Sequence, residues 1–310
     1  KRFKATIKKE LASEKIIQEI YEYIFNAEGK KTRALLCLLA SKSQDKKSNN
    51  RINLASIIEL LHTATLVHDD VVDESELRRG TRSVNQVWTN SYSVLIGDFI
   101  YSKAFILMVK LGIPSILDEL AKATNDIARG EIIQLELFER KQLIKIKDLL
   151  KVSYLKTGRL FEASAKTGAM LACRSKEEIT TFGLLGKALG TAFQIQDDIL
   201  DYEALRLNTG KPALKDFKEG KVTFPLYFAL QHADAKDKDF MMSLLGQSKI
   251  LKKDQNKIYQ LIQNEKTQKD INSLLEKYTK ETLRHLNNLK HHACYNEMLD
   301  LITFSTMRKI

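Results

Sequence analysis

Apolar residues recur every three to four positions along almost the whole chain, which is the period of an α-helix. The spacing predicts helices near residues 5–26, 31–41, 51–74, 91–110, 115–139, 145–173, 176–203, 222–233, 254–262 and 267–306, with the last one broken. Polar segments predict loops at 41–50, 75–90 and 204–221. Because strand-like alternation is missing from the sequence, the pattern predicts an all-α fold.

Composition supports this prediction. The 310 residues contain only 13 Gly and 3 Pro, too few for the closely spaced turns of a β-sandwich or barrel. The sequence has no linker rich in Pro, Gly and Ser and no repeat of solenoid length. We therefore expect a single domain over residues 1–310.

The net charge of +11 is concentrated at the two ends of the chain. Residues 1–50 carry 12 basic and 6 acidic groups, residues 235–310 carry 14 and 9, and the middle is neutral. Solvated helix faces account for such lysines better than a nucleic-acid surface, which needs a concentrated basic face. We expect no nucleic-acid partner, and a loose contact with an anionic membrane is a hypothesis for the surplus.

The three cysteines, Cys37, Cys173 and Cys294, are far apart and have no metal-ligand spacing. They predict reduced, mostly buried thiols rather than a zinc site. No apolar run reaches the length of a membrane span, and no signal peptide is visible in the sequence. The expected location is the cytoplasm.

The most informative feature is the sequence His-Asp-Asp-Val-Val-Asp at 68–73. Asp69 and Asp73 are four residues apart and so share one face of a helix. His62 and Thr65 continue this polar stripe through an otherwise apolar segment. A second cluster repeats the device, because Asp197 and Asp201 follow an apolar segment in which Gln194 extends the stripe.

Asp is a poor helix former, and a buried carboxylate costs several kcal/mol unless it is paired or bound to a metal. One such cluster is consistent with a solvated helix end, whereas two at the ends of core-type helices favour a function. Carboxylates with few His and no Cys nearby suit a hard, oxygen-seeking cation, and Mg²⁺ is the best match because it leaves positions for phosphate oxygens.

Basic residues close to the clusters in sequence indicate an anionic ligand. Arg78 and Arg79 follow the first cluster, and Gly29–Arg33 opens a predicted helix, whose free N–H groups favour anions. Lys156 lies on a central helix, and Lys211 and Lys221 bracket the loop after the second cluster. Each alone fits a surface charge, but the set indicates diphosphate binding.

Taken together, these segments resemble the trans-isoprenyl diphosphate synthases, or (E)-polyprenyl diphosphate synthases. The matching segments run in the family's order over residues 29–225: Gly29–Arg33, Leu61–Arg79, Gly97-Asp98, Gly130-Glu131 with Gln134, Lys156-Thr157, Phe193–Tyr202 and Gly210–Pro225. The resemblance implies a helical bundle around a central cavity and a homodimer. It also implies Mg²⁺-dependent condensation of isopentenyl diphosphate with an allylic diphosphate.

The resemblance also implies roles for individual residues. The metal would be held by Asp69, Asp73 and Asp197, with Asp70 and Asp201 in support. The allylic diphosphate would bind to Arg78, Lys156, Lys211 and Lys221, and isopentenyl diphosphate to Lys30, Arg33, His62 and Arg79. Thr157 and Gln194 would direct oxygen lone pairs at the carbocation. The chain departs from the family pattern at Lys31 and Ala34, where the family usually has Arg and Pro.

Product length is expected to depend on the helix upstream of Asp69. Ala64 and Thr65 are small there, so a tunnel would continue for another turn, about 5.4 Å. This favours a long product, octaprenyl diphosphate for a quinone side chain, with Phe138 as a deeper stop, and a shorter farnesyl or geranylgeranyl product as the alternative. A terpene cyclase, a non-catalytic subunit and a nucleic-acid binder each explain fewer of these motifs.

Overall fold

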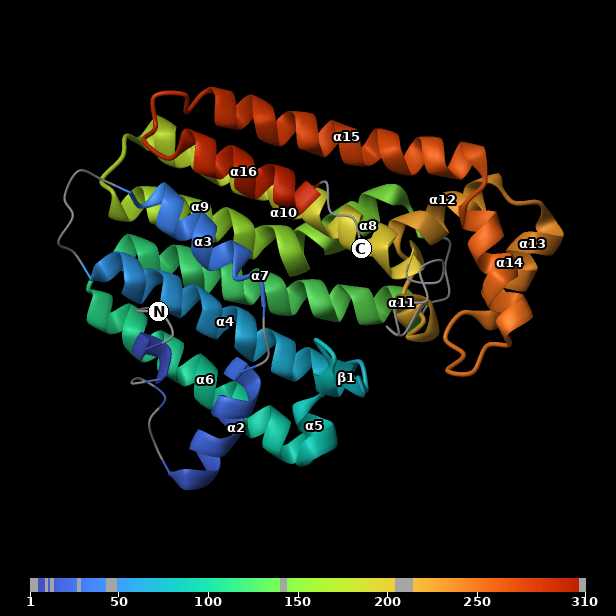
Figure 1. The fold of residues 1–310 in the computed structure, drawn as a ribbon, viewed down its shortest axis with the longest axis horizontal. Coiled ribbons are helices and arrows are strands. Elements are labelled where there is room, and N and C mark those ends of the chain that lie inside the picture. The colour runs from blue at the N-terminus through green and yellow to red at the C-terminus, as the bar shows by residue number, and fades with distance from the viewer. Residues whose placement is uncertain are drawn as a thin grey trace. The chain divides into compact units, whose positions relative to one another are not determined.

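The computed structural model describes residues 5–8, 11, 14–26, 29–42, 49–139, 144–203 and 214–306. Helices make up most of this part of the chain, which confirms the predicted all-α class (Figure 1). The chain divides into two compact units. Unit 1 comprises Lys1–Thr124, Leu160–Gly183 and His291–Met298; unit 2 comprises Asn125–Arg159, Leu184–Lys290 and Leu299–Ile310.

Unit 1 is built around one long helix. Its helices are α2 (Lys15–Asn26), α3 (Thr32–Ala40), α4 (Asn50–Val72), α5 (Val84–Val87), α6 (Asn90–Leu111), the first part of α7 (Pro114–Glu139) and most of α9 (Arg159–Leu171). The central helix is α4, which packs against α6 along its length and also against α3. Figure 1 shows α4 and α6 side by side. This packing fixes the segment that carries the first Asp cluster.

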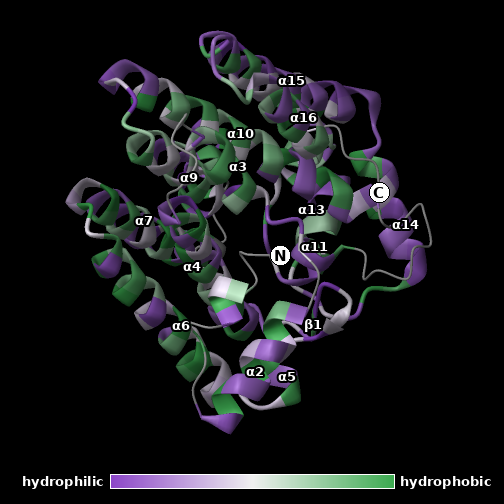
Figure 2. Ribbon diagram, turned by 60° about the vertical axis from the view of Figure 1, so that its left-hand side comes forward, coloured by the Kyte–Doolittle hydropathy of each residue, from purple (hydrophilic) through white to green (hydrophobic). Residues whose placement is uncertain are grey.

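The core of unit 1 explains why α4 is apolar on several sides. Ile57, Leu60 and Ala64 of α4 are fully buried in one cluster with Ile100 and Ala104 of α6. Each buried Ile or Leu side chain contributes about 1.5–3 kcal/mol relative to exposure. Hydrophobic residues recur along α6 in Figure 2, and not all of them face this core.

The segment 75–90 differs from the predicted loop. It contains a short antiparallel hairpin, β1 (Leu77–Arg78) and β2 (Thr81–Arg82), followed by α5. Arg79 and Gly80 form the turn, with φ angles of 53° and 80°. Positive φ at both central positions is the geometry of a two-residue type I′ turn, which matches the twist of paired strands. Four strand residues are too few to produce a recognisable alternation in the sequence.

Unit 2 contains α8 (Ile146–Ser153), the π-helical turn η1 (Tyr154–Gly158), most of α10 (Lys176–Glu203), α11 (Lys215–Lys218), α12 (Phe224–His232), α13 (Ala235–Leu244), α14 (Lys252–Ile262), α15 (Glu265–Asn287) and the end of α16 (Tyr295–Thr306). The helix predicted at 145–173 is thus interrupted by a π-turn, and the last predicted helix is broken as expected. Both α11 and α13 were not predicted.

Two further expectations concern membranes and cysteines. Among the described residues, no helix combines the length and the apolar composition that a membrane span requires. All three cysteines are free; Cys37 and Cys294 are buried, whereas Cys173 is exposed. Burial raises the pKa of the Cys37 thiol above its ordinary value, so this thiol is unreactive.

Candidate active site

The first Asp cluster lies at the C-terminal end of α4. Asp69 is half-buried in the last turn, and Asp73 caps the helix, with its backbone N–H donating to the Asp69 carbonyl at 2.8 Å. The C-terminal end of a helix carries partial negative charge, so it disfavours carboxylates and favours cations. Placing acidic groups here is therefore costly unless a cation is held nearby.

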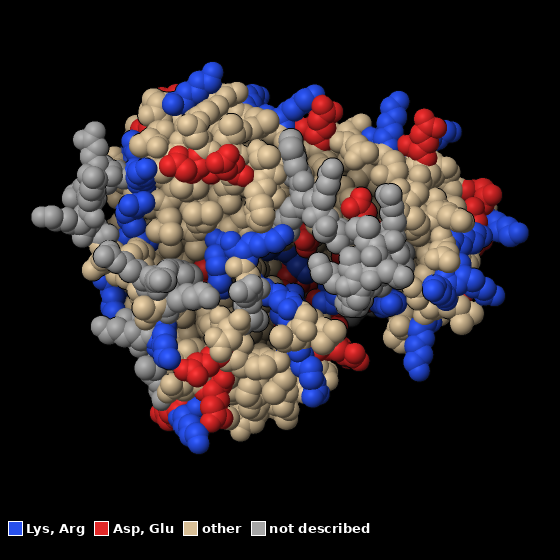
Figure 3. Space-filling view, viewed as in Figure 1, with Lys and Arg blue, Asp and Glu red and all other residues tan. Residues whose placement is uncertain are grey.

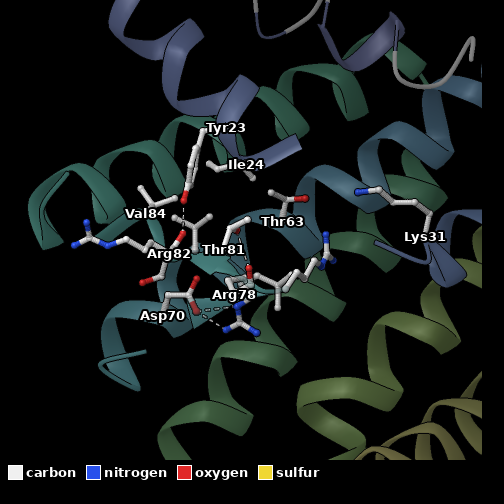
Figure 4. A pocket seen from close by; sticks show the side chains of 13 residues that line it. Tyr23, Ile24, Lys31, Thr63, Asp70, Arg78, Thr81, Arg82 and Val84 are labelled. Carbon is white, nitrogen blue, oxygen red and sulfur yellow. Dashed lines mark hydrogen bonds and ion pairs between the residues drawn. The ribbon is translucent and has the colours of Figure 1, made fainter. Parts of the chain in front are cut away.

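Asp70, the middle residue of the cluster, pairs with a residue of the hairpin. Its side chain is 3% exposed, and its Oδ1 accepts hydrogen bonds from Arg78 Nε at 2.8 Å and Nη2 at 2.5 Å. Figure 4 shows the pair beside a pocket. The contact places the Arg78 guanidinium next to the cluster, and the charge of Asp70 raises the pKa of Arg78 against the lowering effect of burial. The metal-supporting role expected for Asp70 stays a prediction.

Arg79 is held in an uncommon backbone conformation by the I′ turn. Its guanidinium packs on Gly29, where a Cβ would lie only 2.4 Å from Nη1. Gly29 thus permits the close approach of the turn to the segment that precedes α3. Burial lowers the pKa of Arg79, while the carboxylate of Glu59 opposes this effect. Two predicted ligand segments, 29–33 and 78–79, therefore meet in unit 1.

His62 lies within this basic group. Arg33 Nη1 is 3.1 Å from His62 Nε2, and since a guanidinium has no acceptor, the imidazole nitrogen must accept. This fixes a neutral ring with its proton on Nδ1. Burial, and then the charges of Arg33, Arg79, Lys31 and Arg78, lower the pKa of His62 well below 6.5. The ring offers one N–H to an anion without adding a charge.

The segment leading into α3 is anchored from α4. Lys31 occupies the N-cap position with φ 51°, in the left-handed region, and its ammonium lies 3.0 Å from a Glu59 carboxylate oxygen. Lys30 precedes it and is exposed, and Arg33 is 9% exposed over the Phe161 ring at 4.5 Å. Sequence reasoning missed Glu59, although a single acid within the apolar segment Ile57–Leu61 is an unusual feature.

A pocket opens between α2, α4 and the hairpin. Its lining includes Tyr23, Lys31, Thr63, Asp70, Arg78 and Arg79 (Figure 4). The Tyr23 hydroxyl donates to the Arg82 carbonyl at 2.6 Å, and the Tyr23 ring lies edge-on to Trp88 with centroids 5.3 Å apart. These contacts tie α2 to the hairpin that carries the two arginines.

In unit 2, the second cluster lies near the C-terminal end of α10. Asp197 is exposed, whereas Asp198 is 4% exposed and ends a chain of hydrogen bonds. Thr157 Oγ1 donates to Gln194 Oε1 at 2.7 Å, Gln194 Nε2 donates to Asp198 Oδ1 at 2.7 Å, and the Phe224 N–H donates to Oδ2 at 3.2 Å. The two predicted catalytic oxygens, on Thr157 and Gln194, are therefore connected and fixed in orientation.

Asp201 also makes contacts that sequence analysis did not anticipate. Its carboxylate accepts from the backbone N–H groups of Lys215 at 3.1 Å and Asp216 at 3.3 Å, and so holds the start of α11. Burial and the charge of Asp216 raise the pKa of Asp201 to about 7. Burial likewise raises the pKa of Asp216 and, well above its ordinary value, that of Asp198. The carboxylates of this region repel one another.

The predicted phosphate-binding lysines of unit 2 have acidic partners. Lys156 in η1 lies 2.6 Å from Glu131 and donates to Gln134 at 2.7 Å, both on α7. A π-turn widens a helix locally and is frequent at functional sites. Lys221 lies 2.8 Å from Glu219. The predicted ligand Lys211 lies outside the described residues.

The described residues contain no group of three or more His, Cys, Asp or Glu side chains arranged to hold a metal ion. Within the two clusters, Asp70 is paired with Arg78, while Asp198 and Asp201 accept hydrogen bonds from amide groups. The donor set nevertheless fits Mg²⁺, which needs only one or two protein carboxylates beside water and phosphate oxygens. In unit 1, a bound cation would offset the unfavourable helix end at Asp69. In unit 2, a bound cation would relieve the carboxylate repulsion at Asp201.

The residues expected to line a product tunnel lie on the core side of α4. Ala64 is fully buried, and Thr65 is half-buried with its hydroxyl donating to the His62 carbonyl at 2.8 Å. The side chain of Phe138 lies outside the described residues. That Ala64 and Thr65 form part of the wall of a product tunnel remains a prediction.

Comparisons with known proteins identify the class. Residues 14–262 match the polyprenyl synthetase family, and the chain belongs to this family. The protein is accordingly a prenyltransferase, a polyprenyl diphosphate synthase. The resemblance inferred from the motifs is thus confirmed.

Individual relatives agree with this assignment. The chain is 39% identical to the octaprenyl diphosphate synthase of Escherichia coli (strain K12) over 244 residues, which cover 78% of this chain and 75% of the relative. It is similar to the crystal structure of a decaprenyl diphosphate synthase from Rhodobacter capsulatus, with a TM-score of 0.90, 31% identity and coverage of 99% and 95%. A polyprenyl synthase from Caulobacter crescentus CB15, complexed with calcium and isoprenyl diphosphate, gives a TM-score of 0.92, 31% identity and coverage of 99% and 94%.

Proposed function

We propose that the protein condenses isopentenyl diphosphate with an allylic diphosphate, starting from farnesyl diphosphate, to make all-trans octaprenyl diphosphate for a quinone side chain. The observation that carries this proposal is the neutral His62 among Arg33, Lys31 and Arg79, beside the first Asp cluster. An enzyme that ionises one allylic diphosphate needs no such second anion site. An enzyme that adds isopentenyl units does, so the site argues against a terpene cyclase.

The chemistry follows from the residues present. The allylic C–O bond breaks and diphosphate leaves; the double bond of isopentenyl diphosphate attacks the allylic carbon, and the released diphosphate takes up the proton. The hydrogen bonds from Thr157 to Gln194 and on to Asp198 hold oxygen lone pairs in fixed orientations, which stabilises positive charge without reorganisation. Lys156 and Lys221 would exchange their acidic partners for phosphate oxygens.

Mg²⁺ is proposed as the cofactor, held by Asp69, Asp73 and Asp197 with Asp70 and Asp201 in support. When bound, it would neutralise the charge that develops on the leaving diphosphate. The calcium and isoprenyl diphosphate named for the Caulobacter synthase support a divalent cation together with a diphosphate ligand.

Product length is proposed to be set along α4. Ala64 is fully buried one turn from the first cluster, and its methyl group leaves space that an aromatic ring would fill. We expect Ala64→Phe to shorten the products towards the farnesyl and geranylgeranyl range, as measured by thin-layer chromatography of the dephosphorylated alcohols. Products of unchanged length would remove Ala64 from the tunnel wall, and short products from the wild type would favour the short-chain alternative.

A homodimer is proposed from the outer face of α6. Leu95, Ile106 and Val109 are 65%, 47% and 67% exposed and lie at spacings that place them on one side of the helix. A second copy of the chain would bury this apolar face. Light scattering after size exclusion should show a dimer for the wild type and a monomer for Leu95→Glu combined with Val109→Glu.

Organisation and location complete the proposal. We propose one synthase domain over residues 1–310, because α7, α10 and α16 each contribute residues to both units.

We also propose a cytoplasmic protein that contacts an anionic membrane transiently to release product. Leu251 is 65% exposed and lies among Lys249, Lys252 and Lys253, and Figure 3 shows Lys and Arg side chains projecting from the α13 and α14 region.

The test of the whole proposal is direct. Labelled isopentenyl diphosphate is incubated with farnesyl diphosphate and Mg²⁺, and the products are sized. Polyprenyl products that depend on both substrates and disappear with a chelator support the proposal. Cyclic hydrocarbons formed from the allylic substrate alone would contradict it.

A further inference from the structure

We propose that Glu59 is a positioning residue that holds the isopentenyl diphosphate site together through Lys31. This inference rests on the proposed function and adds a residue to it. Glu59 lies on α4 three residues before His62, so the two share one face of the helix. Its side chain is 1% exposed, and its Oε2 lies 3.0 Å from Lys31 Nζ.

The site needs a buried negative charge. Lys31, Arg33, Arg78 and Arg79 all lie close enough to lower the pKa of His62, which shows how crowded the cations are. Asp70 compensates Arg78 directly. Glu59 is paired with Lys31, and its charge also acts on Arg79. Without Glu59, the repulsion among the remaining cations would push their side chains apart towards solvent.

Glu59 also determines the backbone of the segment that carries two predicted ligands. Lys31 has a positive φ of 51°, which is uncommon for a residue other than glycine and needs support from its surroundings. The ion pair with Glu59 and the Phe25 ring, 5.5 Å from the ammonium, supply that support. Lys30 and Arg33 lie on either side of the fixed residue, so their positions depend on it.

The Lys31 ammonium pairs with only one of the two carboxylate oxygens of Glu59. Oε1 is buried and has no hydrogen-bond partner among the described residues. The single point charge of Lys31 satisfies only Oε2, whereas an arginine fork could reach both oxygens. We therefore expect Lys31→Arg to preserve the anchor and Lys31→Met to remove it.

The experiment compares two Glu–Lys ion pairs of unit 1, in each of which the Glu side chain is buried and the Lys side chain is partly exposed. Glu59→Gln is isosteric and removes the charge, and the matched control is Glu119→Gln, since Glu119 is 5% exposed and lies 2.5 Å from Lys166. Glu59→Gln should raise both the KM and the calorimetric Kd for isopentenyl diphosphate about tenfold, with the KM for farnesyl diphosphate changed less than about twofold. The control should change neither constant.

A double-mutant cycle tests the route through Lys31. Lys31→Met should reproduce the effect of Glu59→Gln, the double variant should be no worse than either single one, and Lys31→Arg should bind like the wild type. Additive effects, or equal changes in the constants of both substrates, would overturn the inference while leaving the proposed function intact. If the wild type itself makes no product and binds no isopentenyl diphosphate, both are overturned. Lys31 is partly exposed, so its variants give the answer even if Glu59→Gln is unstable.

Discussion

The two Asp-Asp-x-x-Asp clusters share a spacing but place their middle carboxylates in opposite surroundings. Asp70 accepts two hydrogen bonds from the charged guanidinium of Arg78. Asp198 accepts from the neutral amide of Gln194 and from the Phe224 N–H, and burial raises its pKa. The same local sequence thus holds the Arg78 guanidinium in unit 1. In unit 2 it orients the Gln194 amide and the first residue of α12, Phe224.

In both clusters the first carboxylate also differs from the second in how deeply it is buried. Asp69 and Asp197 are the first residues of their motifs, and neither is as deeply buried as the residue that follows it. The more accessible first carboxylates are the ones proposed to hold Mg²⁺, whereas Asp70 bonds to Arg78 and Asp198 to Gln194 and the Phe224 N–H.

The largest effect is expected for these first carboxylates. Asp69→Ala and Asp197→Ala should each lower kcat/KM by at least about a thousandfold, because each removes a group proposed to hold Mg²⁺ with the leaving diphosphate. Steady-state incorporation of labelled isopentenyl diphosphate measures this. Asp118→Ala, at an exposed pair with Lys122, is the control and should retain activity. Wild-type activity in Asp69→Ala or Asp197→Ala would contradict the proposal that these residues hold Mg²⁺.

A smaller effect distinguishes the middle carboxylates. Asp70→Asn leaves Arg78 without its charged partner and should cost about 2–3 kcal/mol of unfolding free energy, whereas Asp198→Asn loses one acceptor and should cost about 1 kcal/mol. Urea denaturation of the two variants gives both numbers. Equal losses of unfolding free energy would show that the surroundings of Asp70 and Asp198 are energetically alike, and would contradict the difference proposed between them.

A further effect, which depends on pH, concerns protonation in unit 1. The folded-state pKa of His62 lies well below 6.5, so below about pH 6.5 the unfolded chain takes up a proton that the folded protein does not. The free energy of unfolding should therefore fall as the pH decreases, by up to about 1.4 kcal/mol per pH unit from this group. Thermal denaturation between about pH 5 and 7 should show a shallower decrease for His62→Gln than for the wild type. Parallel curves would mean that His62 is not held neutral.

The sequence predicted the helices well because their apolar period is long and regular. The segment 176–203, for example, was predicted with the bounds that α10 has. It predicted the hairpin poorly, because two-residue strands leave no pattern and the I′ turn has Arg79 where Asn or Asp is usual. The π-turn that carries Lys156 has no sequence signature.

The candidate site was predicted as a set of residues rather than as a set of pairs. His62 was identified by the spacing of the polar stripe, and Arg33 by its place in the basic segment that opens a helix. The structure adds that Arg33 donates a hydrogen bond to His62. The partners Glu59, Glu131 and Glu219 could not be paired from sequence, because each is far from its cation along the chain or sits in a surface-like segment. Glu59 alone was detectable, as an isolated charge in an apolar segment.

The contact between Tyr23 and Trp88 has a practical consequence. Trp88 is the single tryptophan of the chain. Its ring touches the residue whose hydroxyl holds the backbone of Arg82, in the hairpin that also carries Arg78 and Arg79. Its emission therefore comes from one known place beside the basic pocket. The protein contains its own optical reporter, and rapid-mixing fluorescence can time how the arginine hairpin responds to a diphosphate without attaching a dye.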